Sequence, residues 1–584
     1  MTTATYGSGI YGTDTYGPAA TVGQQIEVRL STKSGSAGNS LAATPAESLG
    51  KWCSQTVLTD NLPNNLFADF TQAQAEAGRT VYRCLFAYNS GPTDWEPVLY
   101  VFARDPGTDA QVLVAYDDTF GATAVDAGTD QATYVADDVA TGKTWEFTFG
   151  APRRLADAVA LGVIAAGDVR AFWVKIECPA ESRARRNDWA TLRLYDAATD
   201  VEKRFTLVWS IEPTEARIAA ALAGEHGPVS YGFRYEKRSV ANVFEGDVSA
   251  IVTAGSIELD NSRDILRTGS FTVDPALDAT VDFDPLTDHL APFMDLLVDG
   301  SYTWPFQLGL FAANLAPRRR HRPGSSVETW AASDLALHLL EETVTAAYTV
   351  ASGANYITGT NGVQDIIDRF GLQSALPNTS ATLPVAMTWA PGTSYLAIAT
   401  GLLRGAGMYA LWFDVTGVAR TRTLDELSAR TFDVQYSGET FVLAGDVEEE
   451  RETSRFANQI IAIIDDPARG VLSSVKTNSD PDSPTSTVSL GRTITRVIAG
   501  DRAADQDTLD LLAERELQAS ASMFRKVGIA TSIDPRRDGH EVYGLDLGAV
   551  YEGTTWWCRS WAMELKTGGT MRHQLGEVER VVAS

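Results

Sequence analysis

GTSYLAIATGLLRGAGMYALWFDVTGVARTRTLDE, residues 392–426, is the stretch that decides the fold of this chain. Its first half carries apolar residues at helical spacing and predicts a short amphipathic helix that ends at Gly405 and Gly407. Two alternating stretches, 409–414 and 418–424, follow around a Thr-Gly turn. The pattern therefore predicts a helix that leads into a β-hairpin.

The part of the chain before this motif alternates apolar and polar residues in one run after another. The clearest runs are 171–177 and 191–195, and each leaves one apolar and one polar face. Because two sheets of this kind bury their apolar faces against each other, residues 23–210 are predicted to form a β-sandwich. Residues 211–228, an Ala-rich helical stretch followed by Glu-His-Gly-Pro, are predicted to be a linker.

Strand patterns return after the linker and are interrupted by helices. Strands are predicted within residues 229–330, and apolar stripes at helical spacing predict helices at 333–343, 363–370 and 505–521. Residues 478–487, rich in Ser, Pro and Asp, have no apolar period and are predicted to form a mobile loop. The predicted fold class is mainly β, of the α+β type.

The composition is that of a large globular protein. A chain of 584 residues is too long for one hydrophobic core, so about three to five domains are expected. Hydrophobic residues make up 44% of the chain, and no apolar run approaches the roughly 20 residues that span a bilayer. The formal net charge of −27 argues against free-standing nucleic-acid binding, because affinity for phosphate comes from Lys and Arg. The four cysteines form no C-x-x-C pair and are predicted to be mostly buried free thiols.

Two segments are candidates for contacts between subunits. Residues 1–22 repeat Tyr-Gly among Ser, Thr and Asp, and they form either a disordered leader or an extended strap whose tyrosines contact a neighbouring subunit. The basic run of residues 318–322 lies between two prolines and forms a solvated loop, a contact for an acidic neighbouring subunit, or a phosphate contact. The candidate contact residues are Tyr6, Tyr11, Tyr16, Arg318, Arg319, Arg320 and Arg322.

No pattern in the sequence predicts an active site. The chain contains no P-loop, dinucleotide-binding glycine cluster, H-E-x-x-H or G-x-S-x-G motif. Asp282, Asp284 and Asp288 offer oxygen ligands, but the loop lacks the Gly and the terminal Glu of a helical calcium loop, so a solvated acidic turn is favoured. His338 lies near the apolar face of a predicted helix and is predicted to be a packed, hydrogen-bonded histidine. We therefore predict no catalytic, cofactor-binding or metal-binding residues.

The helix and hairpin of residues 392–426, with an Asp-x-x-Gly turn at 414–417, resemble a unit of the central hub proteins in the baseplates and tail tips of long-tailed bacteriophages. Residues 255–273 are similar to the strand pair that opens the first barrel of that family. Residues 452–458 are similar to an acidic, Arg-containing stretch that precedes a strand returning to a second barrel. The resemblance covers roughly residues 231–582 and rests on the order of the elements.

The resemblance implies a hub module with two small β-barrels. The first barrel is expected at 229–330 and the second, with a long helix and closing strands, at 431–584. A helix-containing α/β segment at 331–430 lies between them. Residues 161–179 are similar to part of an immunoglobulin-like accessory domain found beside phage tail proteins, so the N-terminal sandwich is expected to be such a domain.

The resemblance also implies a mechanical function in the virion. In the family, three copies form a ring whose two barrels per subunit match a six-fold tail to a three-fold tip. The chain is then expected to close the tail tube at the tail tip or baseplate and to open for genome ejection. Expected partners are two further copies, the distal tail protein ring, the tape-measure protein and the tip spike or fibre proteins. DNA is expected to pass through the lumen without specific binding, and no membrane insertion is expected.

Enzymatic activity and secretion are not expected. Wall-degrading domains in this family extend beyond the core, and this chain ends at Ser584 directly after the last hub-like strands. The N-terminus lacks a basic region followed by an apolar core, so assembly in the host cytoplasm is expected.

Two alternatives from other classes remain open. A carbohydrate-binding protein for host recognition is permitted by the tryptophans of the sandwich, because aromatic faces stack on sugars, although core packing explains most of them more simply. A secreted glycoside hydrolase of several β-domains is the other, and the missing signal and catalytic motifs argue against it. The tryptophans are Trp52, Trp95, Trp145, Trp173, Trp189 and Trp209.

Overall fold

The computed structural model describes residues 26–34, 41–225, 228–278, 280–284, 286–314, 318–322, 325–424, 430–437, 447–451, 456–466, 470–499, 503–521, 525–546, 551 and 554–578. Strands account for 43% of the structure and helices for 13%, so the predicted mainly β fold is confirmed. The chain divides into two compact units, Met1–Ala221 with Leu297–Thr303, and Leu222–Leu296 with Trp304–Ser584. Within the described ranges, no helix combines the length and the apolar character needed to cross a bilayer.

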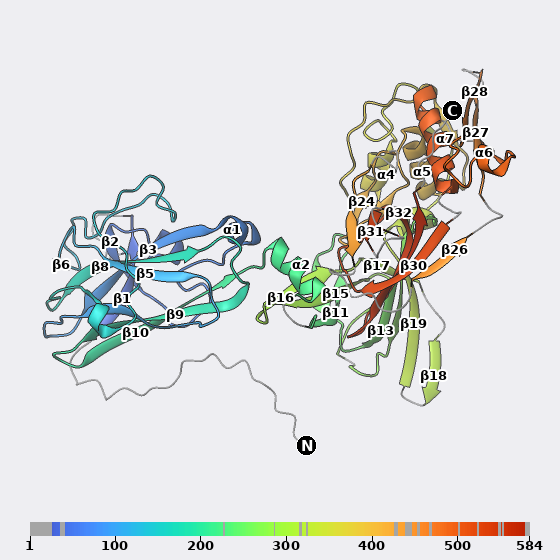
Figure 1. Cartoon of the computed structure of the whole chain (residues 1–584). Helices are drawn as coiled ribbons and strands as arrows, with labels where there is room; N and C mark the ends of the chain where they lie inside the picture. The colour runs from blue at the N-terminus through green and yellow to red at the C-terminus, as the bar shows by residue number, and fades with distance from the viewer. Residues whose placement is uncertain are drawn as a thin grey trace. The chain divides into compact units, whose positions relative to one another are not determined.

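The first unit consists mainly of two antiparallel β-sheets (Figure 1). Its strands are β1 (Ile26–Thr32), β2 (Trp52–Val57), β3 (Arg79–Asn89), β4 (Val98–Arg104), β5 (Gln111–Tyr116), β6 (Thr123–Ala124), β7 (Val159–Ala160), β8 (Asp168–Cys178), β9 (Arg185–Asp196) and β10 (Val201–Ile211). One sheet has the order β2-β1-β3-β8-β5 with β6 beside β8, and the other has the order β10-β9-β4-β7. The helical segments are η2 (Pro45–Glu47), α1 (Gln72–Ala77), η3 (Leu155–Asp157) and α2 (Glu215–Ala223), which continues into the second unit.

These two sheets share one core. The alternation along β8 places Phe172 on the inner face, where its ring lies 6.2 Å from that of Phe205 on β10 of the opposite sheet. Leu85 on β3 and Leu192 on β9 are fully buried in the same core. The predicted sandwich is therefore confirmed, because each sheet covers the apolar face of the other. Its immunoglobulin-like character remains a prediction.

The second unit is built around one large sheet that contains two groups of strands. The first strand group comprises β11 (Tyr231–Arg238), β12 (Phe244–Asp247), β13 (Val252–Asp260), β14 (Arg267–Val273), β15 (His289–Val298), β16 (Tyr302–Gln307), β17 (Phe311–Asn314), β18 (Arg318–Arg322) and β19 (Ser325–Ser333). The second strand group comprises β25 (Val434–Ser437), β26 (Glu448–Arg451), β30 (Arg525–Ser532), β31 (Val542–Asp546), β32 (Thr554–Glu564) and β33 (Thr570–Glu577). The order is β12-β11-β15-β17-β19-β14-β13-β32-β33-β30-β26, with β16 beside β15, β18 beside β19, and β31 between β25 and β32.

Strand β32 joins the two groups. Its first part pairs with β31 in register Val542 with Trp557, and its second part pairs with β13 in register Leu259 with Trp561. Its other edge pairs with β33 over most of its length. The connection between the two groups therefore runs through backbone hydrogen bonds of one eleven-residue strand.

Each strand group curves back on itself. Tyr235 on β11 lies 6.2 Å from Phe271 on β14, measured between ring centroids, although β15, β17 and β19 separate these strands in the sheet order. Tyr436 on β25 likewise lies 5.4 Å from His573 on β33, with β31 and β32 between them. A flat sheet would hold such residues far apart, so both groups curve around an interior, as small barrels do.

An α/β segment lies between the two strand groups along the chain. Its helices are α3 (Ala336–Glu341), α4 (Val363–Arg369) and α5 (Tyr395–Gly405), and its short strands are β20 (Tyr348–Val350), β21 (Gln373–Ser374), β22 (Met387–Trp389), β23 (Trp412–Phe413) and β24 (Val418–Arg420). Helix α5 begins after Ser394, whose Oγ accepts a hydrogen bond from the N–H of Ala397 at 3.2 Å. The predicted helix and hairpin are both present, but the two strands are shorter than the alternating stretches predicted.

A second insertion interrupts the second strand group. It contains β27 (Gln459–Asp466), β28 (Gly470–Thr477), β29 (Thr495–Ala499), α6 (Thr487–Leu490) and α7 (Gln506–Ala521). The strand after residue 458 was predicted to belong to the second barrel, but β27 is the centre of a separate sheet with the order β28-β27-β29. The reason is the alternation of Ile460, Ala462 and Ile464, which bury one face of this sheet against Leu509 and Leu517 of α7.

Candidate interaction surfaces

The Asp-x-x-Gly turn of the hairpin is held by one carboxylate. Oδ1 of Asp414 accepts hydrogen bonds from the N–H groups of Thr416 at 2.9 Å and Val418 at 3.0 Å. Its Oδ2 forms an ion pair with Nε of Arg420 at 2.9 Å. Gly417 closes the turn with φ of +81°, a conformation that costs little only for glycine. The residue types of this turn therefore follow from its geometry.

Replacing Gly417 by alanine is expected to destabilise the second unit by about 2 kcal/mol. The new Cβ would have the unfavourable positive φ and would lie 2.8 Å from Cδ2 of Leu310 and 3.0 Å from Cδ1 of Leu335, which are buried. Gly392 is the matched control, because its φ is +88° but no atom lies within 4 Å of a Cβ there. Chemical denaturation of both variants measures the difference, and equal losses would show that the contact with the leucines has no cost.

A buried ion cluster lies at the start of the segment between β30 and β31. The carboxylate of Asp534 has no exposed surface and pairs with Nε of Arg536 at 2.9 Å and Nε of Arg537 at 3.3 Å. Arg537 also pairs with Glu541 at 3.3 Å. Burial tends to raise the pKa of Asp534, but Arg537 and Arg536 hold it below its usual value. Asp534 and its two arginines therefore remain charged inside the second strand group, whereas burial raises the pKa of Glu541 to about 7.

Two histidines connect the first strand group to helix α3. Nε2 of His289 on β15 lies 3.1 Å from Nε2 of His338 on α3, so one ring must donate and the other must accept. Burial, and then the charge of His338, lowers the pKa of His289 to about 4, and burial lowers the pKa of His338. The predicted packed role of His338 thus has a specific partner that the sequence did not indicate.

This pair is expected to make the second unit sensitive to acid. Below pH 6.5 an unfolded His289 binds a proton that the folded one excludes down to about pH 4, so stability falls as the pH falls through this window. The expected slope from this residue is about 1.4 kcal/mol per pH unit. The His289→Asn variant should show a slope flatter by that amount when unfolding is measured between pH 7 and pH 4. Parallel curves for the two proteins would contradict the assignment.

The predicted contact residues fall in two places. Tyr6, Tyr11 and Tyr16 lie outside the described residues. Arg318, Arg319, Arg320 and Arg322 form strand β18, which pairs antiparallel with β19. A loop was one interpretation of this run, and that interpretation was wrong, because residues 318–322 form a strand. The flanking prolines lie outside the bounds of this strand in the sequence, so they do not interrupt it.

An acidic strand was missed by sequence analysis. Strand β26 consists of Glu448, Glu449, Glu450 and Arg451, and all four are exposed residues, although the side chain of Glu449 is only 26% exposed. It pairs with β30 in register Glu450 with Lys526 and forms one end of the large sheet. The sequence shows a run of three glutamates at this place. Such a run has no apolar alternation, so it does not predict a strand.

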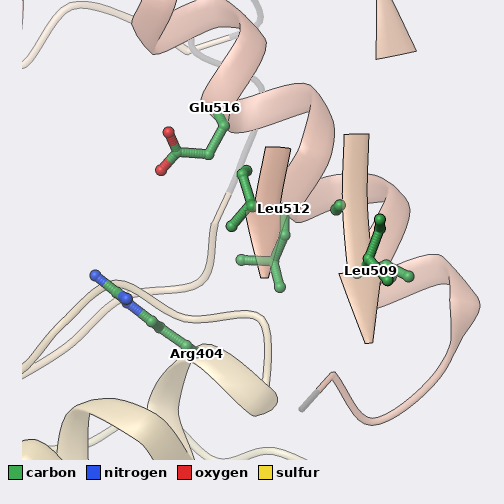
Figure 2. Close-up of a pocket in the computed structure, with 7 residues that line it drawn as sticks. Arg404, Leu509, Leu512 and Glu516 are labelled. Carbon is green, nitrogen blue, oxygen red and sulfur yellow. The ribbon is translucent and has the colours of Figure 1, made fainter. Parts of the chain in front are cut away.

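A small pocket lies between α5, α7 and the sheet of the second insertion. It is lined by Arg404, Ala462, Ile463, Ile498, Leu509, Leu512 and Glu516, and its volume is about 70 Å³. Figure 2 shows the charged ends of Arg404 and Glu516 on one side and the two leucines on the other. Glu516 is paired with Arg496 at 2.6 Å. Pockets for small molecules usually measure ~300–1,000 Å³, so this one has room for a side chain or a few waters.

The other candidate ligands have structural roles. Asp288 of the acidic turn pairs with Nζ of Lys237 at 2.8 Å and accepts from the N–H of Asp284. Across the described parts of the chain, no three His, Cys, Asp or Glu side chains gather in a metal-binding group. The four cysteines are buried and unpaired, as predicted, and burial raises the pKa of Cys53 and Cys558 to about 12. Their thiols are therefore poor nucleophiles.

Part of this chain aligns with solved tail proteins and with a PdpA–VgrG complex. A tail protein from Neisseria meningitidis MC58 aligns with 59% of this chain and 96% of its own length, at 11% identity and a TM-score of 0.41. The 43 kDa tail protein of prophage MuSo2 from Shewanella oneidensis aligns with 59% and 98%, at 10% identity and a TM-score of 0.41. The half-lidded PdpA–VgrG complex from Francisella aligns with 62% and 60%, at 10% identity and a TM-score of 0.38. No family model and no curated protein sequence matches the chain.

Proposed function

We propose that this chain is a structural hub protein of a phage-type tail tip or baseplate. In this role three copies form a ring that closes the tail tube, matches a six-fold tail to a three-fold tip and opens when the genome is ejected. The chain contributes rigid β-structure and contact surfaces, and it has no enzymatic role. The observation that carries the proposal is the joining of two curved strand groups in one sheet by β32.

The two strand groups of each chain support a ring that has twice as many β-modules as subunits. A single chain presents two curved β-modules, so three chains would present six around one axis. Because β32 pairs with β31 over one part and with β13 over another, the two modules of a chain are fixed to each other by main-chain hydrogen bonds. A ring that must resist pressure from a filled tail benefits from such a connection, because two modules joined by strand pairing cannot hinge at a loop.

The acidic character of the chain supports passage of DNA without binding. The net charge is −27, and a lumen lined by carboxylates would repel phosphate. The expected partners are the distal tail protein ring above, the tape-measure protein inside and the spike or fibre proteins below. The N-terminal sandwich and the tyrosines of residues 1–22 would contact a neighbouring tail component. A strongly positive lumen wall in the assembled particle would refute the proposed lining.

The carbohydrate-binding alternative has less support. Trp95 and Trp173 have no exposed surface and Trp209 has 1%, so these rings belong to the sandwich core and present no face to a sugar. Trp52 is buried as well, at 7% exposed. Core packing is therefore the role of four of the six tryptophans that suggested sugar binding.

The proposal is tested by removing this chain from the particle that carries it. Tails assembled without it should lack a closed tip, and supplying the chain in trans should restore closed, infectious particles. The same preparation can be labelled with an antibody against residues 41–211, which should mark one end of the tail. Normal tails in the absence of the chain, or label along the whole tail, would overturn the proposal.

A further inference from the structure

Two edge strands of the second unit carry opposite charges. Strand β18 has arginine at four of its five positions, and strand β26 has glutamate at three of its four. Among the residues that the structure describes, β18 pairs only with β19 and β26 pairs only with β30. Each strand therefore has one edge whose main-chain N–H and C=O groups are not used by a described strand. Such an edge is a template on which another strand can pair.

The basic hairpin extends beyond its neighbours. Strand β14 pairs with β19 only from Glu328 to Ser333, whereas β18 pairs with β19 from Ser325 to Glu328. Among the described strands, the outer part of the hairpin therefore has no second neighbour in the sheet, and Figure 1 shows it projecting from the body of the strands. The hairpin is placed to reach a surface outside its own chain.

The acidic strand has the complementary pattern. The described ion pairs of β26 involve Glu449, which pairs with Arg451 at 3.2 Å and Arg525 at 3.1 Å. Glu448 and Glu450 alternate with it and share the opposite face of the strand. Both are exposed, so their carboxylates are hydrated and accessible to a partner. Asp446 and Glu452 extend the acidic sequence on either side.

We propose that β18 of one copy pairs with the edge of β26 of the next copy, so that neighbouring chains are joined by a strand pair with opposite charges. This inference rests on the proposed ring of identical chains. Like charges on facing strands destabilise a pair, so β18 does not pair with another β18, nor β26 with another β26. Pairing between two different edges is head-to-tail, and head-to-tail contacts close into a ring when the rotation permits. The two strands match in length, at about 13–17 Å each.

Charge reversal on each side of the full-length chain tests the inference. The variants are Arg318→Glu with Arg320→Glu, Glu448→Arg with Glu450→Arg, and all four substitutions together. Self-association is measured by sedimentation at low and at high salt. The wild type should associate at low salt. Each two-residue variant should associate at least about tenfold more weakly, and the four-residue variant should recover the association of the wild type. Added salt should weaken association of the wild type and of the four-residue variant.

The design separates strand pairing from the effect of total charge. One two-residue variant makes the acidic chain more negative and the other makes it less negative, so an effect of net charge would move association in opposite directions. Pairing requires that both weaken it. Reversal of the exposed ion pair between Glu342 and Arg369 leaves the net charge unchanged and should leave association unchanged. Circular dichroism and the thermal midpoint confirm that each variant is folded.

Three results would overturn the inference. One is a wild-type chain that stays monomeric at low salt and high concentration. The second is a folded four-residue variant that fails to recover. The third is a two-residue variant that associates like the wild type, which would mean that these charges only protect the edges from aggregation. A ring at the tail axis of a particle carrying either two-residue variant would leave the proposed function intact while the inference fails. Absence of the wild-type chain from the axis would instead remove the proposed function.

Discussion

Replacing Arg537 by methionine should destabilise the second unit by about 3–5 kcal/mol, the usual cost of leaving a buried charge without its partner. The Arg537 side chain is 7% exposed and pairs with Asp534 and Glu541, which have 0% and 12% exposed side chains. Removing the guanidinium leaves Asp534 with one partner and Glu541 with none of its described ion pairs. Urea denaturation followed by near-ultraviolet circular dichroism measures the loss.

The neighbouring Arg536 provides the matched control for this experiment. It pairs with the same carboxylate of Asp534, but its side chain is 28% exposed, so water replaces part of the interaction when it is removed. The Arg536→Met variant should therefore lose clearly less stability than the Arg537→Met variant. Equal losses, or a loss below 1 kcal/mol for Arg537→Met, would show that the cluster does not hold the second strand group together.

Replacing Trp561 by alanine should have a similarly large effect, because this residue lies where the two strand groups meet. Trp561 is 1% exposed on β32, its backbone pairs with Leu259 on β13, and Arg267 lies 5.5 Å from its ring. Truncation of a buried tryptophan costs about 3–5 kcal/mol. We expect this loss together with faster amide hydrogen exchange in β13, measured residue by residue.

The choice of substitution and of readout makes this prediction specific. Trp561→Phe keeps part of the buried aromatic area and should lose roughly half as much stability. Trp557 on the same strand pairs with β31 and is half-buried, so Trp557→Ala should affect exchange in β31 more than in β13. If Trp561→Ala left exchange in β13 unchanged, β32 would not be the element that couples the two strand groups.

The sequence predicted the helices and the turn because their signals are local. Helix α5 begins after a Ser cap, and the turn that follows needs Asp414 for its hydrogen bonds and Gly417 for its positive φ. These requirements are properties of a few adjacent residues, so they are visible in the sequence. The overall mainly β character was also accessible from the alternation of residues 171–177.

What the sequence did not indicate depends on contacts between distant residues. The strand pairing of β13 with β32 joins residues about three hundred positions apart, and no local pattern encodes it. The loop of residues 478–487 was predicted to be mobile from its polar composition. Instead Asn478 is fully buried and its Nδ2 donates to Ser483 Oγ at 2.9 Å and Thr485 Oγ1 at 3.1 Å. The same side chains fit a solvated loop or a buried network, and only the fold decides between them.

The candidate surfaces could be predicted only in part, because they too depend on contacts between distant residues. Four arginines within five residues are evident in the sequence, but their place on an edge strand is a property of the sheet. The glutamates of β26 gave no strand signal, because a short edge strand with exposed faces needs no apolar residues. The complementarity of the two strands is visible only once the order of the sheet is known.

Electron microscopy of an intact particle, with the tail tip reconstructed at a resolution that separates strands, tests the central claim most directly. We predict three copies of this chain around the tail axis, with the two strand groups of each chain alternating to give six similar modules around the tube. Single copies attached to the outside of the tail, away from the axial channel, would contradict this account.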